Sequence, residues 1–227
     1  GLSTYGNQVH SNPSLSRPIK YGLLEVIEYI HIQKYNIKYN INSPICSLAA
    51  FYGKFDILKW AIKNGYRMSA FTCAWAAEKG NFEILKWAHE NGCPWDEYTC
   101  ANAAGSGHFE ILKWAYENGC LMGASTCELA AEGGHIEILK WARENGCPWN
   151  EWTCAKAARM GHFEILKWAR DNGCPWGCST IVDAAESGYN EIAEWAIKNG
   201  CPIDIPTFCD DYEAEYPELV VWIKAHE

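Results

Sequence analysis

The chain repeats itself along most of its length with a period of 27 residues. The clearest copies are five identical strings, Ile-Leu-Lys-Trp-Ala, which begin at Ile57, Ile84, Ile111, Ile138 and Ile165. Weaker copies begin at Ile192 and Leu219. A unit of this size cannot bury its apolar side chains alone, so successive units must stack around a continuous core. The period therefore predicts an elongated repeat protein.

Each unit contains two predicted helices, as the copy that starts at Thr99 illustrates. Its first helix is rich in Ala, opens at Thr99 as the N-terminal cap and ends at Gly107. The second helix runs from about His108 to Asn118, where apolar residues recur every three or four positions on one face. Six units then end in Asn-Gly, where the glycine can adopt the left-handed conformation that ends a helix without a Cβ clash. These glycines are Gly65, Gly92, Gly119, Gly146, Gly173 and Gly200.

The two helices of a unit differ in the size of their side chains. The first carries Ala, which lets neighbouring helices approach closely, and the second carries Ile, Leu and Trp. This difference predicts an all-α solenoid that curves, with the first helices on the concave side. Residues 21–227 are expected to form about seven such units, the last a polar cap, and residues 1–20 a divergent or disordered N-terminal segment or cap.

The composition excludes several classes of function. The chain has 19 Lys and Arg against 28 Asp and Glu, and the net charge of −9 disfavours nucleic acids and anionic membranes as partners. No stretch is long and apolar enough for a predicted transmembrane helix. The familiar catalytic, nucleotide and zinc-protease motifs are missing, so we expect neither an enzyme nor a cofactor. Without a secretory signal or an Asn-x-Ser/Thr acceptor, we expect an intracellular location, cytoplasmic and, for a viral protein, in the host cell.

Ten of the twelve Cys recur at two fixed places in the unit. One column holds Cys46, Cys73, Cys100, Cys127 and Cys154, and the other Cys93, Cys120, Cys147, Cys174 and Cys201. A residue that recurs in every unit is most simply part of the scaffold, and no Cys-x-x-Cys pair is present. Buried free thiols are favoured, while disulfides and metal ligands stay open as alternatives. Cys178 and Cys209 lie outside both columns.

The same test applies to His and Trp. Because His108, His135 and His162 all follow the glycine between the helices, we predict capping or hydrogen bonds between units rather than catalysis. Ten of the twelve Trp fall in a second-helix column or a loop column and are predicted core residues. Trp75 and Trp152 are left over.

The unit resembles the ankyrin repeat. Thr-Cys-Ala-x-Ala-Ala-x-x-Gly-His-Phe-Glu-Ile-Leu-Lys-Trp-Ala-x-x-Asn-Gly-Cys is similar to the family's Thr-Pro-Leu-His-x-Ala-Ala, Gly-His-Leu-Glu-Ile-Val and Asn-Gly-Ala. An ordinary ankyrin repeat has about 33 residues, so the missing residues imply shortened or absent β-hairpin fingers. The sequence looks like the short Trp- and Cys-rich ankyrin-like repeats of large DNA viruses of amoebae and of some protists. The resemblance implies binding of other proteins through the concave first-helix positions.

One face of the first helix changes from unit to unit, as a specific binding site requires. Its positions follow the spacing i, i+4, i+7 and i+8, and aromatic, charged and apolar residues mix there. Such a mixture is typical of protein-binding surfaces, although exposed positions that simply drift would also vary. The candidate partner-binding residues are Phe71, Trp75, Tyr98, Asn102, Leu129, Trp152, Lys156, Arg159, Met160 and Asp183.

These observations predict a monomeric, non-catalytic module for protein–protein interaction. Its partner is unidentified. The alternative is a structural or assembly protein that associates with itself or with a particle, through exposed aromatic residues or Cys cross-links.

Overall fold

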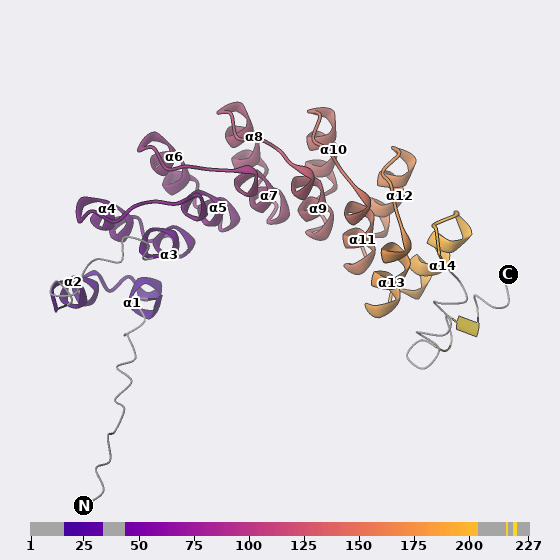
Figure 1. Ribbon diagram of the computed structural model, residues 1–227, viewed down its shortest axis with the longest axis horizontal. Coiled ribbons are helices and arrows are strands. Elements are labelled where there is room, and N and C mark those ends of the chain that lie inside the picture. Colours follow the sequence, from indigo (N-terminus) through magenta and orange to yellow (C-terminus); the bar gives the residue numbers. More distant parts are fainter. Residues whose placement is uncertain (1–15, 34–43, 204–216, 218–219, 222–227) are drawn as a thin grey trace, which may run out of the picture.

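The computed structural model describes residues 16–33, 44–203, 217 and 220–221. Within these ranges the chain forms fourteen α-helices and no strand, arranged as a curved stack of helix pairs (Figure 1). The predicted all-α solenoid without β-hairpin fingers is confirmed for this part of the chain. Residues 1–15 of the predicted N-terminal segment and most of the polar last unit, from residue 204, lie outside the described residues.

The helices alternate as first and second members of a pair. The first members are α1 (Ser16–Tyr21), α3 (Ile45–Phe51), α5 (Ala70–Glu78), α7 (Glu97–Gly105), α9 (Ala124–Glu132), α11 (Glu151–Arg159) and α13 (Cys178–Glu186). The second members are α2 (Leu24–Gln33), α4 (Phe55–Lys63), α6 (Phe82–Glu90), α8 (Phe109–Glu117), α10 (Ile136–Glu144), α12 (Phe163–Asp171) and α14 (Asn190–Lys198).

The first helices begin earlier than the predicted cap. In α7 the cap is Asp96, whose carboxylate accepts a hydrogen bond from the backbone N–H of Tyr98 at 3.1 Å. Asn150 caps α11 in the same way. Thr99 lies inside the first turn of α7 and is buried. The prediction of Thr99 as cap was wrong because the true cap residue differs between units, whereas the buried Thr recurs in five of them.

The predicted Asn-Gly stops are confirmed. Gly119, after α8, has a φ of 90°, which favours glycine, and the other five have positive φ as well. The side chain of Asn118 donates a hydrogen bond to the carbonyl of Trp114 at 2.8 Å. The second helices α4, α6, α8, α10, α12 and α14 therefore each end in a turn that satisfies one of their last carbonyls.

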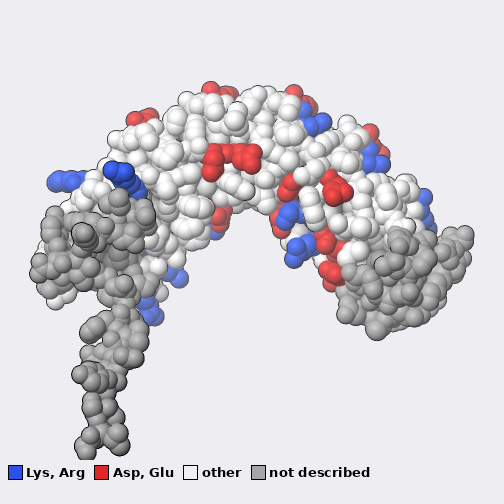
Figure 2. Space-filling model, in the orientation of Figure 1, with Lys and Arg blue, Asp and Glu red and all other residues white. Residues whose placement is uncertain are grey.

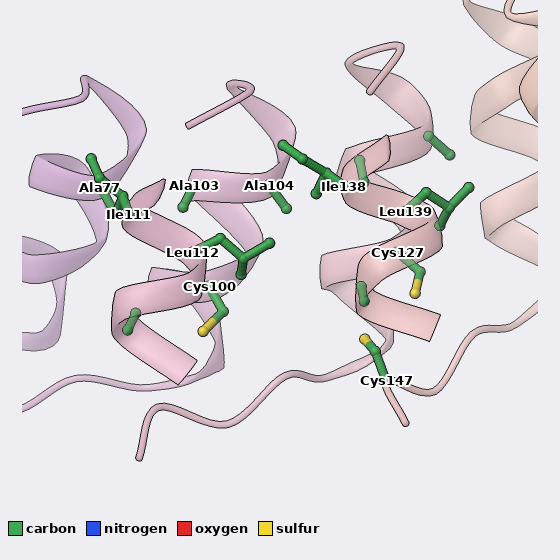
Figure 3. Packing of buried hydrophobic residues seen from close by; sticks show 14 of the residues in the cluster. Ala77, Cys100, Ala103, Ala104, Ile111, Leu112, Cys127, Ile138, Leu139 and Cys147 are labelled. Carbon is green, nitrogen blue, oxygen red and sulfur yellow. The ribbon is translucent and has the colours of Figure 1, made fainter. Parts of the chain in front are cut away.

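The buried apolar residues form one cluster along the stack, and Figure 3 shows a part of it. Cys100, Ala103 and Ala104 from α7 are fully buried, as is Leu112 from α8. Successive first helices pack directly against one another, whereas contacts between successive second helices are sparser. The first helices therefore lie on the inner side of the arc and the second helices fan out on its outer side, as predicted (Figure 1).

The outer layer joins neighbouring units through aromatic rings. The ring of Phe109 in α8 meets the edge of Trp141 in α10 at 5.7 Å between centroids, and Lys113 lies 4.0 Å above the Phe109 ring. Glu110 forms an ion pair with Lys113 at 3.2 Å. Similar Phe and Trp pairs recur along the outer layer, so the second-helix Trp residues pack between units while staying half-buried.

Histidine also joins neighbouring units. Nε2 of His108 lies 3.1 Å from the carbonyl oxygen of Glu78, in the preceding unit, and the ring covers Gly80. His162 bonds to Glu132 in the same manner. The predicted hydrogen bonding between units is confirmed for His108 and His162. His108 stands at the N-cap position of α8, but its side chain makes no capping hydrogen bond.

Candidate partner-binding surface

All ten candidate residues belong to the first-helix layer, on the inner side of the arc. Phe71 and Trp75 lie on α5, Tyr98 and Asn102 on α7, Leu129 on α9, Trp152, Lys156 and Arg159 on α11, Met160 directly after it, and Asp183 on α13. The structure brings them into one band across five units, but it gives them different degrees of exposure.

Aromatic rings gather at the N-terminal end of this band. Phe71 is 64% exposed, and its ring lies 5.8 Å from that of Trp75. Trp75 is half-buried because its other side meets the ring of Phe51 in α3, also at 5.8 Å. Lys79 lies 4.4 Å above the Phe51 ring and pairs with Glu78 at 2.7 Å. This aromatic group offers an exposed apolar rim with one cation beside it.

The residues in the middle of the band are less accessible to a partner. Tyr98 is 55% exposed. Asn102 is half-buried and donates a hydrogen bond to the carbonyl of Ala74 in the preceding first helix at 3.3 Å. Leu129 lies against Gly105, where an added Cβ would come within 2.9 Å of it. Asn102 and Leu129 therefore hold neighbouring first helices together as well as facing inward.

The C-terminal end of the band mixes charge with apolar surface. Trp152 is 47% exposed and Met160 46%. Lys156 pairs with Glu132 on α9 at 2.8 Å. Burial raises the pKa of Asp183, and the nearby Arg159 opposes that shift. Figure 2 shows Lys or Arg and Asp or Glu atoms intermingled on the inner edge of the arc toward this end.

Sequence reasoning missed Phe51 and Lys79 as members of the aromatic group. Phe51 is 27 residues before Glu78, so it belongs to a column already recognised as variable. Lys79 was in such a column too, but its place above an aromatic ring depends on the contact between α3 and α5. The variation of its column between units could have identified Phe51 as a candidate. The contact of Lys79 with an aromatic ring could be found only from the structure.

The two Cys columns meet inside each unit. In α9, Cys127 donates a hydrogen bond to the sulfur of Cys147, which raises the pKa of Cys127 and lowers that of Cys147. Cys147 in turn donates to the carbonyl of Gly123 at 3.2 Å, at the start of α9. Figure 3 shows the two side chains pointing toward one another, Cys127 from the helix and Cys147 from the loop. The column cysteines are free and buried, which confirms the favoured interpretation for this part of the chain.

Neither a metal centre nor a membrane span emerges from the described ranges. They contain no group of three or more His, Cys, Asp or Glu residues placed to hold a metal ion. None of their helices is sufficiently long and apolar to cross a bilayer.

Stacked pairs of short antiparallel helices around one continuous core define an α-solenoid repeat protein. Residues 127–170 match the family model described as ankyrin repeats (many copies). The crystal structure of the human ASB11 ankyrin repeat domain is similar, with a TM-score of 0.53 and 18% sequence identity. That match covers 70% of this chain and 85% of the human domain. A comparison with curated proteins finds no match.

Residues 127–170 therefore match the ankyrin repeat family, and the described chain has the fold of an ankyrin repeat domain. The matched segment spans parts of two units whose pattern recurs in register along the array. Ankyrin repeats are generally modules for protein–protein interaction and act as non-catalytic scaffolds. The likeness to short viral repeats stays a prediction.

Proposed function

We propose that this protein is a non-catalytic module that binds a protein partner on the inner face of the arc. The observation that carries the proposal is the exposure of large aromatic residues at one repeated place, the second residue of a first helix. Phe71, Tyr98 and Trp152 occupy that place in three units and expose about half or more of their surface. Partly exposed aromatic residues of this kind are frequent anchors at protein interfaces.

The contrast with the outer face supports this choice. The aromatic residues of the second helices contact rings of the neighbouring unit, so their packing has a reason within the fold. Tyr98 and Trp152 point to a use outside the fold, since they remain exposed although burial would stabilise the protein.

The two ends of the inner face differ in charge, which favours a partner whose surface has both apolar and charged parts. The aromatic group of Phe51, Phe71 and Trp75 is flanked by Lys79, whereas Lys156 and Arg159 face acidic residues of α9 and α13. A partner with an apolar segment followed by polar and charged residues would match both ends. Such a partner would have to compete with the ion pair between Lys156 and Glu132.

The test is affinity capture with the full chain and with a Tyr98→Ala, Trp152→Ala double variant as parallel baits. Proteins retained by the first bait and lost with the second are candidates, whose affinities are then measured with purified components. We expect the double variant to weaken binding at least tenfold while the melting temperature stays nearly unchanged. Tyr116→Ala, an exposed aromatic on the outer helix α8, is the matched control and should leave affinity unchanged.

Loss of binding with Tyr116→Ala but not with the double variant would move the site to the outer face and reject the proposal. The alternative of self-assembly is separated by sedimentation. Association of the chain with itself that disappears in the Tyr98→Ala, Trp152→Ala variant would assign these residues to assembly instead of partner binding.

A further inference from the structure

Cys178 differs from every other cysteine in the described part of the chain. It is exposed, while the remaining ten are buried. It stands at the first residue of α13, outside both repeated columns. The last described unit has Ile181 where the preceding four units have the first-helix Cys that pairs with the loop Cys.

The loop cysteine of this unit is still present. Cys201 is buried, and its thiol donates a hydrogen bond to the carbonyl of Gly177 at 3.2 Å. Gly177 is the cap of α13 and directly precedes Cys178. The sulfur of Cys201 therefore lies beneath the first turn of α13, next to the residue that carries the exposed thiol.

The regular units show how a first-helix thiol and a loop thiol interact when they lie close together. In them, a thiol on the first helix donates to the loop sulfur 20 residues later, as Cys154 does to Cys174. In the last described unit, the first-helix thiol has moved one helical turn toward the N-terminus, from the place of Ile181 to that of Cys178. Cys178 is exposed whereas Ile181 is buried, so the thiol stands at the rim of the helix, directly after Gly177, whose carbonyl accepts the hydrogen bond from Cys201.

We propose that Cys178 and Cys201 form an oxidisable dithiol, and that Cys178 is the site at which a low-molecular-weight disulfide reacts. Exposure selects Cys178 for attack, since the other described thiols are closed off by packing. Proximity then selects Cys201 as the second thiol.

The chemistry proceeds by two thiol–disulfide exchanges. The thiolate of Cys178 attacks one sulfur of glutathione disulfide, a bond forms between them, and glutathione leaves as a thiolate. Cys201 then loses its proton to solvent and attacks the sulfur of Cys178, which expels the second glutathione. Two protein thiols are oxidised to one disulfide, and glutathione disulfide is reduced to two molecules of glutathione.

The second step is slower than the first. Burial raises the pKa of Cys201 to about 12; the nearby Arg170 opposes the rise, and Cys178 adds to it. The thiolate of Cys201 is therefore scarce at neutral pH. We expect the mixed disulfide at Cys178 to accumulate first and the internal disulfide to form faster as the pH rises.

The experiment incubates the full chain with oxidised glutathione at pH 7, 8 and 9, blocks free thiols with an alkylating reagent and maps the peptides by mass spectrometry. Mapping assigns each modification to its own cysteine, Cys209 included. The expected result is glutathione on Cys178 first, followed by a link between the Cys178 and Cys201 peptides. The rate of linking should rise about tenfold for each pH unit, because it depends on the thiolate fraction.

Three variants sharpen the result. Cys201→Ser should trap glutathione on Cys178, and Cys178→Ser should leave Cys201 unmodified. Cys174→Ser, which removes a buried loop cysteine of the regular kind, should give the same products as the natural chain. Circular dichroism shows whether each variant is folded, and Cys178→Ser, an exposed change, keeps the test valid if Cys201→Ser unfolds.

The proposal is overturned if Cys178 stays unmodified while buried cysteines react, or if Cys178 links to a cysteine other than Cys201. It is also overturned if Cys201 acquires glutathione in the Cys178→Ser variant as fast as Cys178 does in the natural chain.

Discussion

The carbonyl oxygen of Gly105 occupies the space that a Cβ atom on Gly133 would need. Gly105 is the last residue of α7 and Gly133 follows α9, so the ends of two successive first helices meet backbone to backbone. Both residues belong to the columns that vary between units. Glycine at position 133 permits this close approach, since a backbone oxygen cannot move aside as a side chain can.

Gly133→Ala is expected to lower the free energy of unfolding by about 1–3 kcal/mol, because the added methyl group forces α7 and α9 apart. Urea denaturation measures the change. Ser187→Ala, at the equivalent and exposed place after α13, is the control and should stay within about 0.5 kcal/mol of the natural chain. Equal losses in the two variants would contradict the steric explanation.

Gly107→Ala is expected to destabilise more than Gly119→Ala. Both glycines have positive φ, 77° and 90°, which alone costs Ala about 1 kcal/mol. Only at Gly107 would the new Cβ also lie 2.7 Å from a ring atom of His135. The additional loss should shrink in a His135→Ala background, as a double-mutant cycle followed by thermal unfolding can show.

Three Trp→Ala substitutions should separate packing from exposure. Trp114 contacts the rings of Phe82 and Trp95, so its removal should cost about 2 kcal/mol or more. Trp152 is exposed and should cost under about 0.5 kcal/mol. Trp75 should fall between them because it is half-buried. A loss at Trp152 as large as at Trp114 would make Trp152 a structural residue and remove it from the proposed site.

Asp183→Asn is expected to stabilise the protein at pH 7. The folded state holds the pKa of this carboxyl above its usual range, mainly through burial, so folding binds a proton. The contribution of Asp183 to stability is therefore favourable at low pH, and it is lost as the pH rises through the raised pKa of the folded state. The stabilisation by Asn should be absent near pH 3, with Glu110→Gln, an exposed change of one charge on the outer side, as the control. A gain that is equal at both pH values would contradict this linkage.

Periodicity predicted most of the architecture. The 27-residue spacing, the Asn-Gly stops and the Ala-rich first helices specified the helix pairs, their stacking and the direction of curvature. Each of these depends on features repeated in every unit, which a single sequence displays several times over. The burial of the Cys columns followed from the same repetition.

The features that differ between units were harder to predict. The cap residues Asp96 and Asn150 were overlooked in favour of the recurring Thr99. The stacking of Arg143 on Trp149, at 4.0 Å, pairs a varying helix position with a varying loop position six residues later. Such pairs depend on how a loop folds back over its own helix, which periodicity does not describe.

The candidate site shows the same division. Column variation located the inner face and its exposed residues Phe71, Tyr98 and Trp152. It could not show that Asn102 and Leu129, in the same columns, contact the preceding first helix, because side-chain reach between units depends on the distance between helices.

The unequal packing of the two layers has a mechanical consequence. A curved beam bends about its stiffest layer, and here that layer is the inner one, where first helices touch directly. Opening or closing the arc would change the spacing of the outer helices most and the spacing of the inner ones least. The distances between Phe71, Tyr98 and Trp152 would therefore stay nearly constant while the array bends.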